Sequence, residues 1–448
     1  MLVIISDLHL IDGTLGVPTS PQTFSLFAHR LRELVYRASW RADGRYRPLE
    51  SVDILLLGDI LDPLQSAQWL QRDPQDTSYI RPWHDWRNPL FALTVQRITR
   101  QILAQNTHAG EVFRRLASGE ALRLPPADER GHPDFTSRAR IAPRARLHYM
   151  VGNHDWYYHL PGAAFDDIRR EIIAAFALSN AASPFPHDSN ESGLLTGLFM
   201  EYSLAARHGD IFDNYSCNRL WGRDAASLAD FISCEVVFRF PRELERLYGA
   251  QIPPTVLAAV REVTHVHPAL AAPLWLKSQV RALTTSRQLS RTIKNCWNEV
   301  VERFFQMEEV RQQVAALGPS EFQALRLLLT VSKNVSFTTI SKVSGWLAER
   351  YSQNGRSLAQ NARQESDILE KRARFVVYGH THKHEVIALD GAHVAPEQAS
   401  QVYINTGSWG TYNDLSRGTK INLLTCAALY RQDERGGRPF ETFQIQFP

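Results

Sequence analysis

Residues 147–155 read Leu-His-Tyr-Met-Val-Gly-Asn-His-Asp, a mostly apolar run that changes abruptly into a polar one. The apolar half predicts a buried β-strand, because a short run of large side chains ended by a glycine suits a strand covered on both faces. The polar half, Gly152 to Asp155, has no packing purpose directly after such a strand. We interpret it as part of a functional site at the carboxyl end of the strand.

The same arrangement recurs at four other places along the chain. Apolar runs over 2–6, 52–57, 199–207 and 375–378 each predict a strand. The polar residues that follow these runs are Asp7 and His9, Asp59 and Asp62, His208 and Asp210, and His380 and His382. Ligands of α/β proteins gather beyond the carboxyl ends of strands, so we expect the five clusters to converge.

Helical patterns separate the first strands. Ser20-Pro21 is typical of an N-cap followed by the first helical residue, and apolar residues then recur at helical spacing as far as Val35. Strand, helix and strand in this order predict a parallel pair joined by a crossover helix. Further helices are expected over 90–104, 165–176 and 293–317, the last ended by Gly318-Pro319, and further strands over 402–404, 421–430 and 440–447.

The bulk composition limits the class of protein. A chain of 448 residues is expected to form one large domain with insertions, or two domains. Its 50 Lys and Arg nearly balance 47 Asp and Glu, which argues against a partner held mainly by bulk electrostatics. The four cysteines form no CxxC pair, so reduced core residues are expected. Without a signal-peptide pattern or a run of ~20 apolar residues, a soluble cytoplasmic protein is predicted.

The collected polar groups indicate a metal site. Taken singly, Asp-x-His or Gly-Asp-x-x-Asp is also ordinary cap or turn chemistry, and His208 alone would be an ordinary loop histidine. As a set they offer oxygen and imidazole ligands without thiolate, which suits manganese, iron or zinc. Two metals about 3.5–4 Å apart, bridged by one carboxylate, would use ligands that one metal would leave unused. The set comprises Asp7, His9, Asp59, Asn153, His208, His380 and His382.

The motifs resemble those of the calcineurin-like metallophosphoesterase superfamily. They are Asp7-x-His9, Gly58-Asp59-x-x-Asp62, Gly152-Asn153-His154-Asp155, His208 and Gly379-His380-x-His382. The resemblance covers 1–62, 141–214 and 373–448, and implies an α/β catalytic core built as a two-sheet β-sandwich flanked by helices (α/β/β/α). The Trp-, Pro- and Arg-rich segment 63–140 and the mainly helical segment 215–372 would be insertions, the second serving as a cap or for binding a partner.

The resemblance also implies a dinuclear-metal-dependent phosphoester hydrolase, with manganese expected and iron or zinc as alternatives. One metal would be bound by Asp7, His9 and His382 and the other by Asn153, His208 and His380, with Asp59 bridging them. A hydroxide between the metals would attack phosphorus in line. His154 would protonate the leaving oxygen, and Asp62 would orient this histidine. Asp155 and Asp210 are expected to support the ligands and their loops.

The substrate is less constrained. A small phosphomonoester or phosphodiester, or a nucleotide-type pyrophosphate, is expected. The motifs around His208 and His380 are similar to those of UDP-2,3-diacylglucosamine hydrolases, but His154 stands where those enzymes carry arginine. A DNA or RNA nuclease of the same superfamily is the alternative, since 277–299 is rich in Lys and Arg, although a solvated helix face explains those residues better. A non-catalytic scaffold that binds a protein partner through 215–372 is the alternative of another class.

Several other residues receive structural interpretations. His84, His148 and His159 lack a partner pattern and are expected to be structural. The tryptophans of the first insertion could stack on a base or sugar, but packing of that insertion onto the core is favoured. They are Trp69, Trp83 and Trp86.

Overall fold

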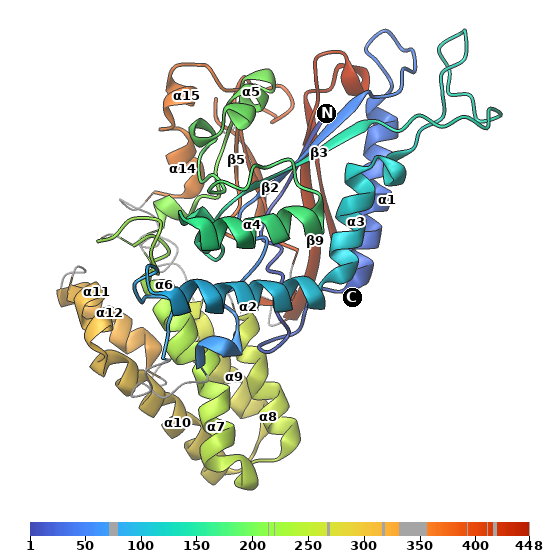
Figure 1. The fold of residues 1–448 in the computed structure, drawn as a ribbon. Helices are drawn as coiled ribbons and strands as arrows, with labels where there is room; N and C mark the ends of the chain where they lie inside the picture. Colours follow the sequence, from blue (N-terminus) through green and yellow to red (C-terminus); the bar gives the residue numbers. More distant parts are fainter. Residues whose placement is uncertain are drawn as a thin grey trace.

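The protein has an α/β fold with two mixed β-sheets (Figure 1). The structure is a computed structural model that describes residues 1–70, 79–213, 215–218, 220–266, 269–315, 319–330, 356–391, 393–409, 411–414 and 419–447.

The first sheet has the order β10-β9-β1-β2-β3, with β8 beside β9. The strands β1, β2 and β3 are parallel, while β9 runs antiparallel to β1 and β10. The crossover from β1 to β2 is helix α1 (Pro21–Ala38), so the predicted parallel pair with a helix between its strands is confirmed. The strands are β1 (Leu2–Ile5), β2 (Ser51–Leu57), β3 (Arg144–Met150), β8 (Thr411–Asp414), β9 (Thr419–Leu429) and β10 (Phe440–Phe447).

The second sheet has the order β4-β5-β7-β6. Its strands β4, β5 and β7 are parallel, and β6 is an antiparallel edge strand. The strands are β4 (Leu204–Ala206), β5 (Phe375–Tyr378), β6 (His384–Ala388) and β7 (Val402–Thr406).

Successive side chains of a strand point to opposite faces of its sheet, and this places the two sheets and the helices in layers. Leu2 and Ile4 of β1 belong to an apolar cluster shared with Val377 of the second sheet. Their neighbours Val3 and Ile5 point the other way, into a cluster with the helices on the outer face of the first sheet. Those helices are α1, α2 (Pro89–Gln105), α3 (Thr107–Ala117) and α4 (Ala163–Phe176). Helices α14 (Leu358–Ala362) and α15 (Ser366–Leu369) pack on the outer face of the second sheet.

Every regular element described between 215 and 372 is helical. This segment begins with α6 (Leu228–Ile232), which continues through a π-helical turn (Ser233–Phe238) into α7. Apart from α14 and α15, its helices lie together in the lower part of Figure 1. They are α6, α7 (Arg239–Tyr248), α8 (Pro254–Arg261), α9 (Ala272–Leu283), α10 (Arg287–Gln306), α11 (Glu308–Ala315) and α12 (Pro319–Leu329).

This helical lobe is anchored on loops that follow β1 and β2. The ring of Trp83 stacks on that of Phe231, with ring centroids 4.1 Å apart. The Arg81 guanidinium pairs with Glu235 of the π-helical turn at 3.1 Å, and both side chains are buried. The backbone N–H of Val17 lies 3.0 Å from His265 Nε2. The lobe therefore sits at the carboxyl ends of the strands, where the polar clusters lie.

Two predicted elements were wrong. The apolar run over 199–207 is not one strand, because helix α5 (Gly193–Glu201) includes Phe199 and β4 is only three residues long. The Ser192 side chain caps this helix by accepting from the Leu195 N–H, and a short apolar run fits a buried helix as well as a strand. The helix predicted over 293–317 is interrupted at Met307, whose backbone is extended, although buried Val310 continues the apolar period beyond the break. Gly318 lies outside the described residues.

Other features of the chain are local. Cys234, Cys296 and Cys426 are buried, Cys217 is partly exposed, and all four are free thiols. Within the described ranges, no helix has the length and apolar character needed to cross a membrane. Short 3₁₀ turns are η1 (Ala67–Leu70), η2 (Glu120–Leu122), η3 (Trp156–His159), η4 (Ser189–Glu191), η5 (Asp210–Phe212), η7 (Gly249–Gln251), η8 (Glu262–His265), η9 (Ala269–Ala271) and η11 (Glu434–Gly437).

Candidate metal centre

The five polar clusters meet where five strands end. Asp7 and His9 follow β1, Asp59 follows β2, Asn153 follows β3, His208 follows β4, and His380 and His382 follow β5. The strands β1, β2 and β3 are neighbours in one sheet, and β4 and β5 are neighbours in the other. His208 Nε2 lies 3.1 Å from Asp59 Oδ2, so the loops of the two sheets are in contact. The structure thus brings all seven predicted ligands into one cluster.

One group of donors is formed by Asp7, His9 and His382. His382 Nε2 lies 3.5 Å from Asp7 Oδ1 and 3.1 Å from His9 Nε2. His9 Nε2 is 4.0 Å from Asp7 Oδ1. Three donor atoms from the segments after β1 and β5 therefore lie close enough together to hold an ion.

A second group is formed by Asn153, His208 and His380. The Asn153 side-chain oxygen lies 3.0 Å from His380 Nδ1, and the His208 and His380 rings are 5.3 Å apart between centroids. Asp59 lies between the two groups, because its Oδ2 is 3.1 Å from His208 Nε2 and 3.8 Å from His9 Nε2. A carboxylate in this position faces both sets of donors.

The donor set fits divalent cations. Asp7, Asp59 and His208 are almost fully buried, and their donor atoms form a further group close enough to share an ion. Although His208 Nε2 is near Asp59, it makes no hydrogen bond of acceptable geometry within the described part of the chain. This nitrogen and the Asp59 carboxylate face each other at 3.1 Å, so a cation bound here would be within reach of both donors. Carboxylate, amide and imidazole donors are those that manganese, iron and zinc accept.

The backbone at the site is unusual. Five of the predicted ligands have positive φ angles, which side-chain-bearing residues adopt at a cost of about 1–3 kcal/mol each. They are Asp7 (53°), His9 (43°), Asp59 (53°), His380 (69°) and His382 (59°). Only four other non-glycine residues in the described ranges have positive φ. Strain concentrated in this way is typical of residues held for function rather than for packing.

Two motif glycines make room for the ligands. A Cβ atom at Gly152 would collide with Asp59 Oδ1 and the His208 ring, and one at Gly379 would collide with Asp7 Oδ2. Any larger residue at either position would therefore displace a predicted ligand.

Burial and mutual charge set the protonation of the centre. Burial raises the pKa of Asp7. It acts in the same direction on Asp59, but His208 and the other nearby histidines outweigh it and hold the pKa of that carboxyl well below its usual range. Burial disfavours the charged form of His208, yet Asp59 and Asp7 raise its pKa to about 10. These pKa shifts favour a charged His208 beside an anionic Asp59, and a divalent cation bound here would compete with the histidine proton.

His154 is held by Asp62. Asp62 Oδ2 lies 2.9 Å from His154 Nδ1 and 3.0 Å from His9 Nδ1. Burial opposes the charge of His154, but Asp62 and Asp59 overcome this and raise its pKa well above the usual value. The His154 side chain is 18% exposed, whereas Asp62 is almost fully buried. The contact with buried Asp62 therefore fixes the orientation of the His154 ring, and the raised pKa favours a proton on this partly exposed side chain.

Asp155 and Asp210 differ in their contacts. Asp155 accepts from the backbone N–H groups of Gly152 and Ile60 and from the Tyr149 hydroxyl, and so joins the loops after β2 and β3. Burial, with Asp59, raises the pKa of Asp155 to about 6. Asp210 accepts from Arg223 at 3.0 Å and makes no hydrogen bond with His208, whose Nδ1 instead donates to the Leu57 carbonyl at 3.0 Å.

The structure adds two carboxylates that the sequence did not single out. Asp213 Oδ2 lies 3.0 Å from His380 Nε2, so His380 is positioned between Asp213 and Asn153. Asp230, buried on α6, is close enough to His154 for the two charges to interact, although burial raises the pKa of Asp230 to about 7. Asp213 was one polar residue in a polar loop, and Ser227 to Asp230 is an ordinary capping box. Neither carried a signal beyond its local structure.

No protein-family model matches the chain, and a search of curated proteins found none similar to it in sequence. The case for a function therefore rests on the geometry of the described residues. That geometry provides two groups of side chains that could hold a metal ion, a carboxylate between them, and beside them a histidine whose pKa the nearby carboxylates raise.

Proposed function

We propose that this chain is a dinuclear-metal-dependent phosphoester hydrolase of the calcineurin-like metallophosphoesterase type. The observation that carries the proposal is the meeting of five motif clusters at five strand ends, with Asp59 facing both groups of donors. Two sheets that share an apolar layer, with helices on their outer faces, are compatible with the sandwich that the resemblance implies. Segments 63–140 and 215–372 would then be insertions.

Asp7, His9 and His382 would hold one ion, Asn153, His208 and His380 the other, and Asp59 would contact both. Two bound divalent cations, manganese by preference and iron or zinc as alternatives, lower the pKa of water and neutralise charge on phosphoryl oxygens.

The exposure of the side chains indicates how a substrate would approach. Asp7 and Asp59 are buried, whereas His9, His154 and His382 remain 11%, 18% and 12% exposed. A phosphoryl group would therefore approach from the side of the imidazoles, with the carboxylates behind them. This arrangement keeps the negative charges of protein and substrate apart.

His154 would act as the general acid. Its Nδ1 faces Asp62, which leaves the proton on Nε2 available for the leaving oxygen. Because Asp62 is anionic and buried, it holds both the orientation and the charge of this ring. General acid catalysis of this kind contributes roughly 10²–10⁴-fold to a rate.

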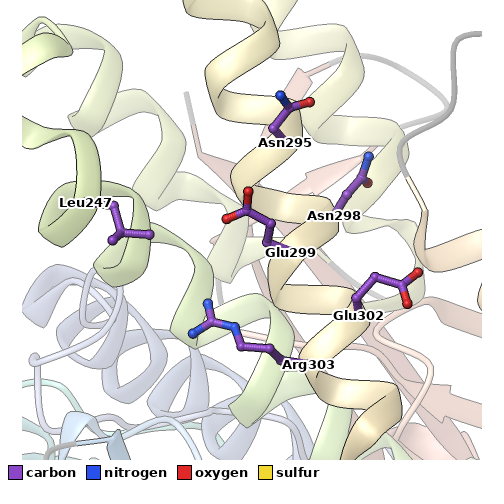
Figure 2. Close-up of a pocket in the computed structure, with 6 residues that line it drawn as sticks. All are labelled: Leu247, Asn295, Asn298, Glu299, Glu302 and Arg303. Atoms are coloured by element: carbon purple, nitrogen blue, oxygen red, sulfur yellow. The ribbon is translucent and has the colours of Figure 1, made fainter.

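A small substrate is favoured over a nucleic acid. The pocket in Figure 2 lies between α7 and α10, beside the segment whose basic residues suggested phosphate contacts. The charged residues of this pocket are mixed, because Glu299 and Glu302 are carboxylates, Arg303 is cationic and Glu302 pairs with Arg326, so the pocket is not a basic patch for a phosphate backbone. The lining residues are Leu247, Asn295, Asn298, Glu299, Glu302 and Arg303.

The proposal is tested by hydrolysis of p-nitrophenyl phosphate and bis-p-nitrophenyl phosphate with manganese, iron or zinc. We expect activity in the wild type and its loss in Asp59→Asn, because this variant loses the carboxylate between the donor groups. Asp53→Asn is the matched control, since Asp53 is also buried but lies near the start of β2. A wild type that binds two ions and hydrolyses neither ester with any of these metals would favour the scaffold alternative.

A further inference from the structure

A second cluster of metal-binding side chains lies outside the predicted centre. It consists of His159 on η3, His187 in the loop after α4, and Asp224 in the loop between η5 and α6. One donor atom from each residue lies within 4.8 Å of the other two. We propose that these three residues bind a zinc ion separate from the dinuclear centre. The proposal does not depend on the hydrolase function.

The distances suit zinc. His187 Nε2 lies 3.1 Å from Asp224 Oδ1, and His159 Nε2 lies 3.8 Å from Asp224 Oδ2. Tetrahedral zinc with bonds of about 2.0–2.1 Å places its ligand atoms roughly 3.3–3.4 Å apart, between these two values. The Asp224 side chain is 43% exposed and that of His159 is 22% exposed, so water can reach a fourth position.

In its neutral form, the ring of His159 would direct a lone pair at the Asp224 carboxylate. Its Nδ1 lies 2.8 Å from the Phe185 carbonyl oxygen, and only an N–H group can pair with a carbonyl. In the neutral ring, Nε2 then carries a lone pair towards Asp224, which is repulsive unless a cation lies between them. A backbone carbonyl on the second ring nitrogen is a common support for metal-binding histidines.

His187 is positioned by the contact of its Nε2 atom with Asp224. The residue is 4% exposed, and its Nδ1 has no hydrogen-bond partner within the described ranges. Its ring centroid lies 4.4 Å from that of His159, so the two imidazoles converge on Asp224. Arg223, the nearest cationic side chain in sequence, is already paired with Asp188 and Asp210. Asp224 faces both histidines through their Nε2 atoms, while Glu191 Oε2 lies 3.7 Å from Nδ1 of His159.

A zinc ion at this position would join three loops. His159 follows the Gly152–Asp155 motif, and Asp224 stands next to Arg223, which pairs with Asp210 in the loop of His208. The ion would thus fasten the entry to the helical lobe against the β3 side of the core. We assign it a structural role, because none of its ligands belongs to the predicted dinuclear centre.

The direct test is the anomalous scattering of zinc in crystals of the full chain grown with the metal. A peak among His159, His187 and Asp224 is expected, and its absence from crystals grown in excess zinc would overturn the proposal. Because peaks are located individually, this result is independent of whether the chain hydrolyses phosphoesters.

Zinc counting in solution provides the second measurement. After dialysis, Asp224→Asn is expected to retain one zinc equivalent fewer than the wild type, with an affinity for that equivalent at least about tenfold lower. Asparagine preserves the shape of this partly exposed side chain, so folding should survive. The matched control is His108→Gln on α3, an exposed histidine hydrogen-bonded to Ser25, which should retain every equivalent. Equal zinc content in wild type and Asp224→Asn would show a purely hydrogen-bonded cluster.

Discussion

Replacing Asp62 by asparagine removes the buried negative charge that contacts His154 and His9, while preserving the shape of the side chain. Asp62 Oδ2 lies 2.9 Å from His154 Nδ1 and 3.0 Å from His9 Nδ1. A hydrogen bond to a charged group contributes about 1.5–3 kcal/mol. If the bond to His154 is fully expressed in the transition state, its loss lowers kcat roughly 10- to 150-fold, at about 1.4 kcal/mol for each factor of ten.

The assay compares two leaving groups at saturating metal. An alkyl phosphate needs a proton from His154 as its oxygen departs, so its hydrolysis should show the full loss. A p-nitrophenyl ester releases a stable anion and needs little protonation, so Asp62→Asn should slow it only about 2- to 5-fold, well short of the full loss. Asp53→Asn is the control for replacement of a buried aspartate and should change neither rate.

The effect on His9 must be separated from the effect on His154. Metal content is therefore measured for each variant, because His9 is a predicted ligand and shares Asp62 with the acid. Equal losses of rate for alkyl and aryl esters, with metal content unchanged, would refute the assignment of His154 and Asp62 to leaving-group protonation.

Three further predictions concern stability and metal binding. Burial alone would raise the pKa of Asp53, but hydrogen bonds and charge from His148 and Arg146 lower it below the ordinary value. These two contacts therefore stabilise the folded protein fully above the ordinary aspartate pKa of about 3.9, and this stabilisation is lost as the pH falls through the lower pKa of the folded state. Asp53→Asn should therefore reduce the free energy of unfolding by about 1–3 kcal/mol at pH 7, and urea titrations should show this difference narrowing below about pH 4; a constant difference would contradict the argument. Gly152→Ala should lower the affinity for metal and reduce the free energy of unfolding by about 1–3 kcal/mol, because the new methyl group collides with Asp59 and His208. Metal counting and thermal melting measure the two effects. A normal metal affinity in this variant would contradict the prediction. Removal of metal by a chelator should lower the melting temperature, because a ligand at a hundredfold excess over its Kd contributes about 2.7 kcal/mol, and an identical melting curve would show that the centre binds no ion tightly.

Much of the predicted site could be located from sequence because its signals are local. Each strand end of the centre is a short apolar run followed by polar residues. The strands β1, β2 and β5 were predicted within one residue of their observed bounds, while β3 begins three residues before the predicted run. The shared edge of parallel strands then required their polar ends to meet. The metals, the roles of the ligands and the reaction remain predictions.

The remaining features depend on partners distant in sequence. The contact of Asp213 with His380 joins residues far apart in the chain, and so does the charge interaction of Asp230 with His154. His159 had no partner pattern, since its neighbours come from two later loops. The edge strand β6 has exposed Glu385 and Ile387 and so gave a weak pattern. These features are set by tertiary packing rather than by local periodicity.

The ligand residues with positive φ angles also concern the order of folding and metal binding. The Asp7 and His9 N–H groups donate to the carbonyls of Gly58 and Asp59, and the Asp62 N–H donates to Leu10. These bonds continue the pairing of β1 and β2 into the two ligand loops and need no ion. Refolding of the sheets should therefore not depend on metal concentration, whereas metal loading of the predicted centre should accelerate with it.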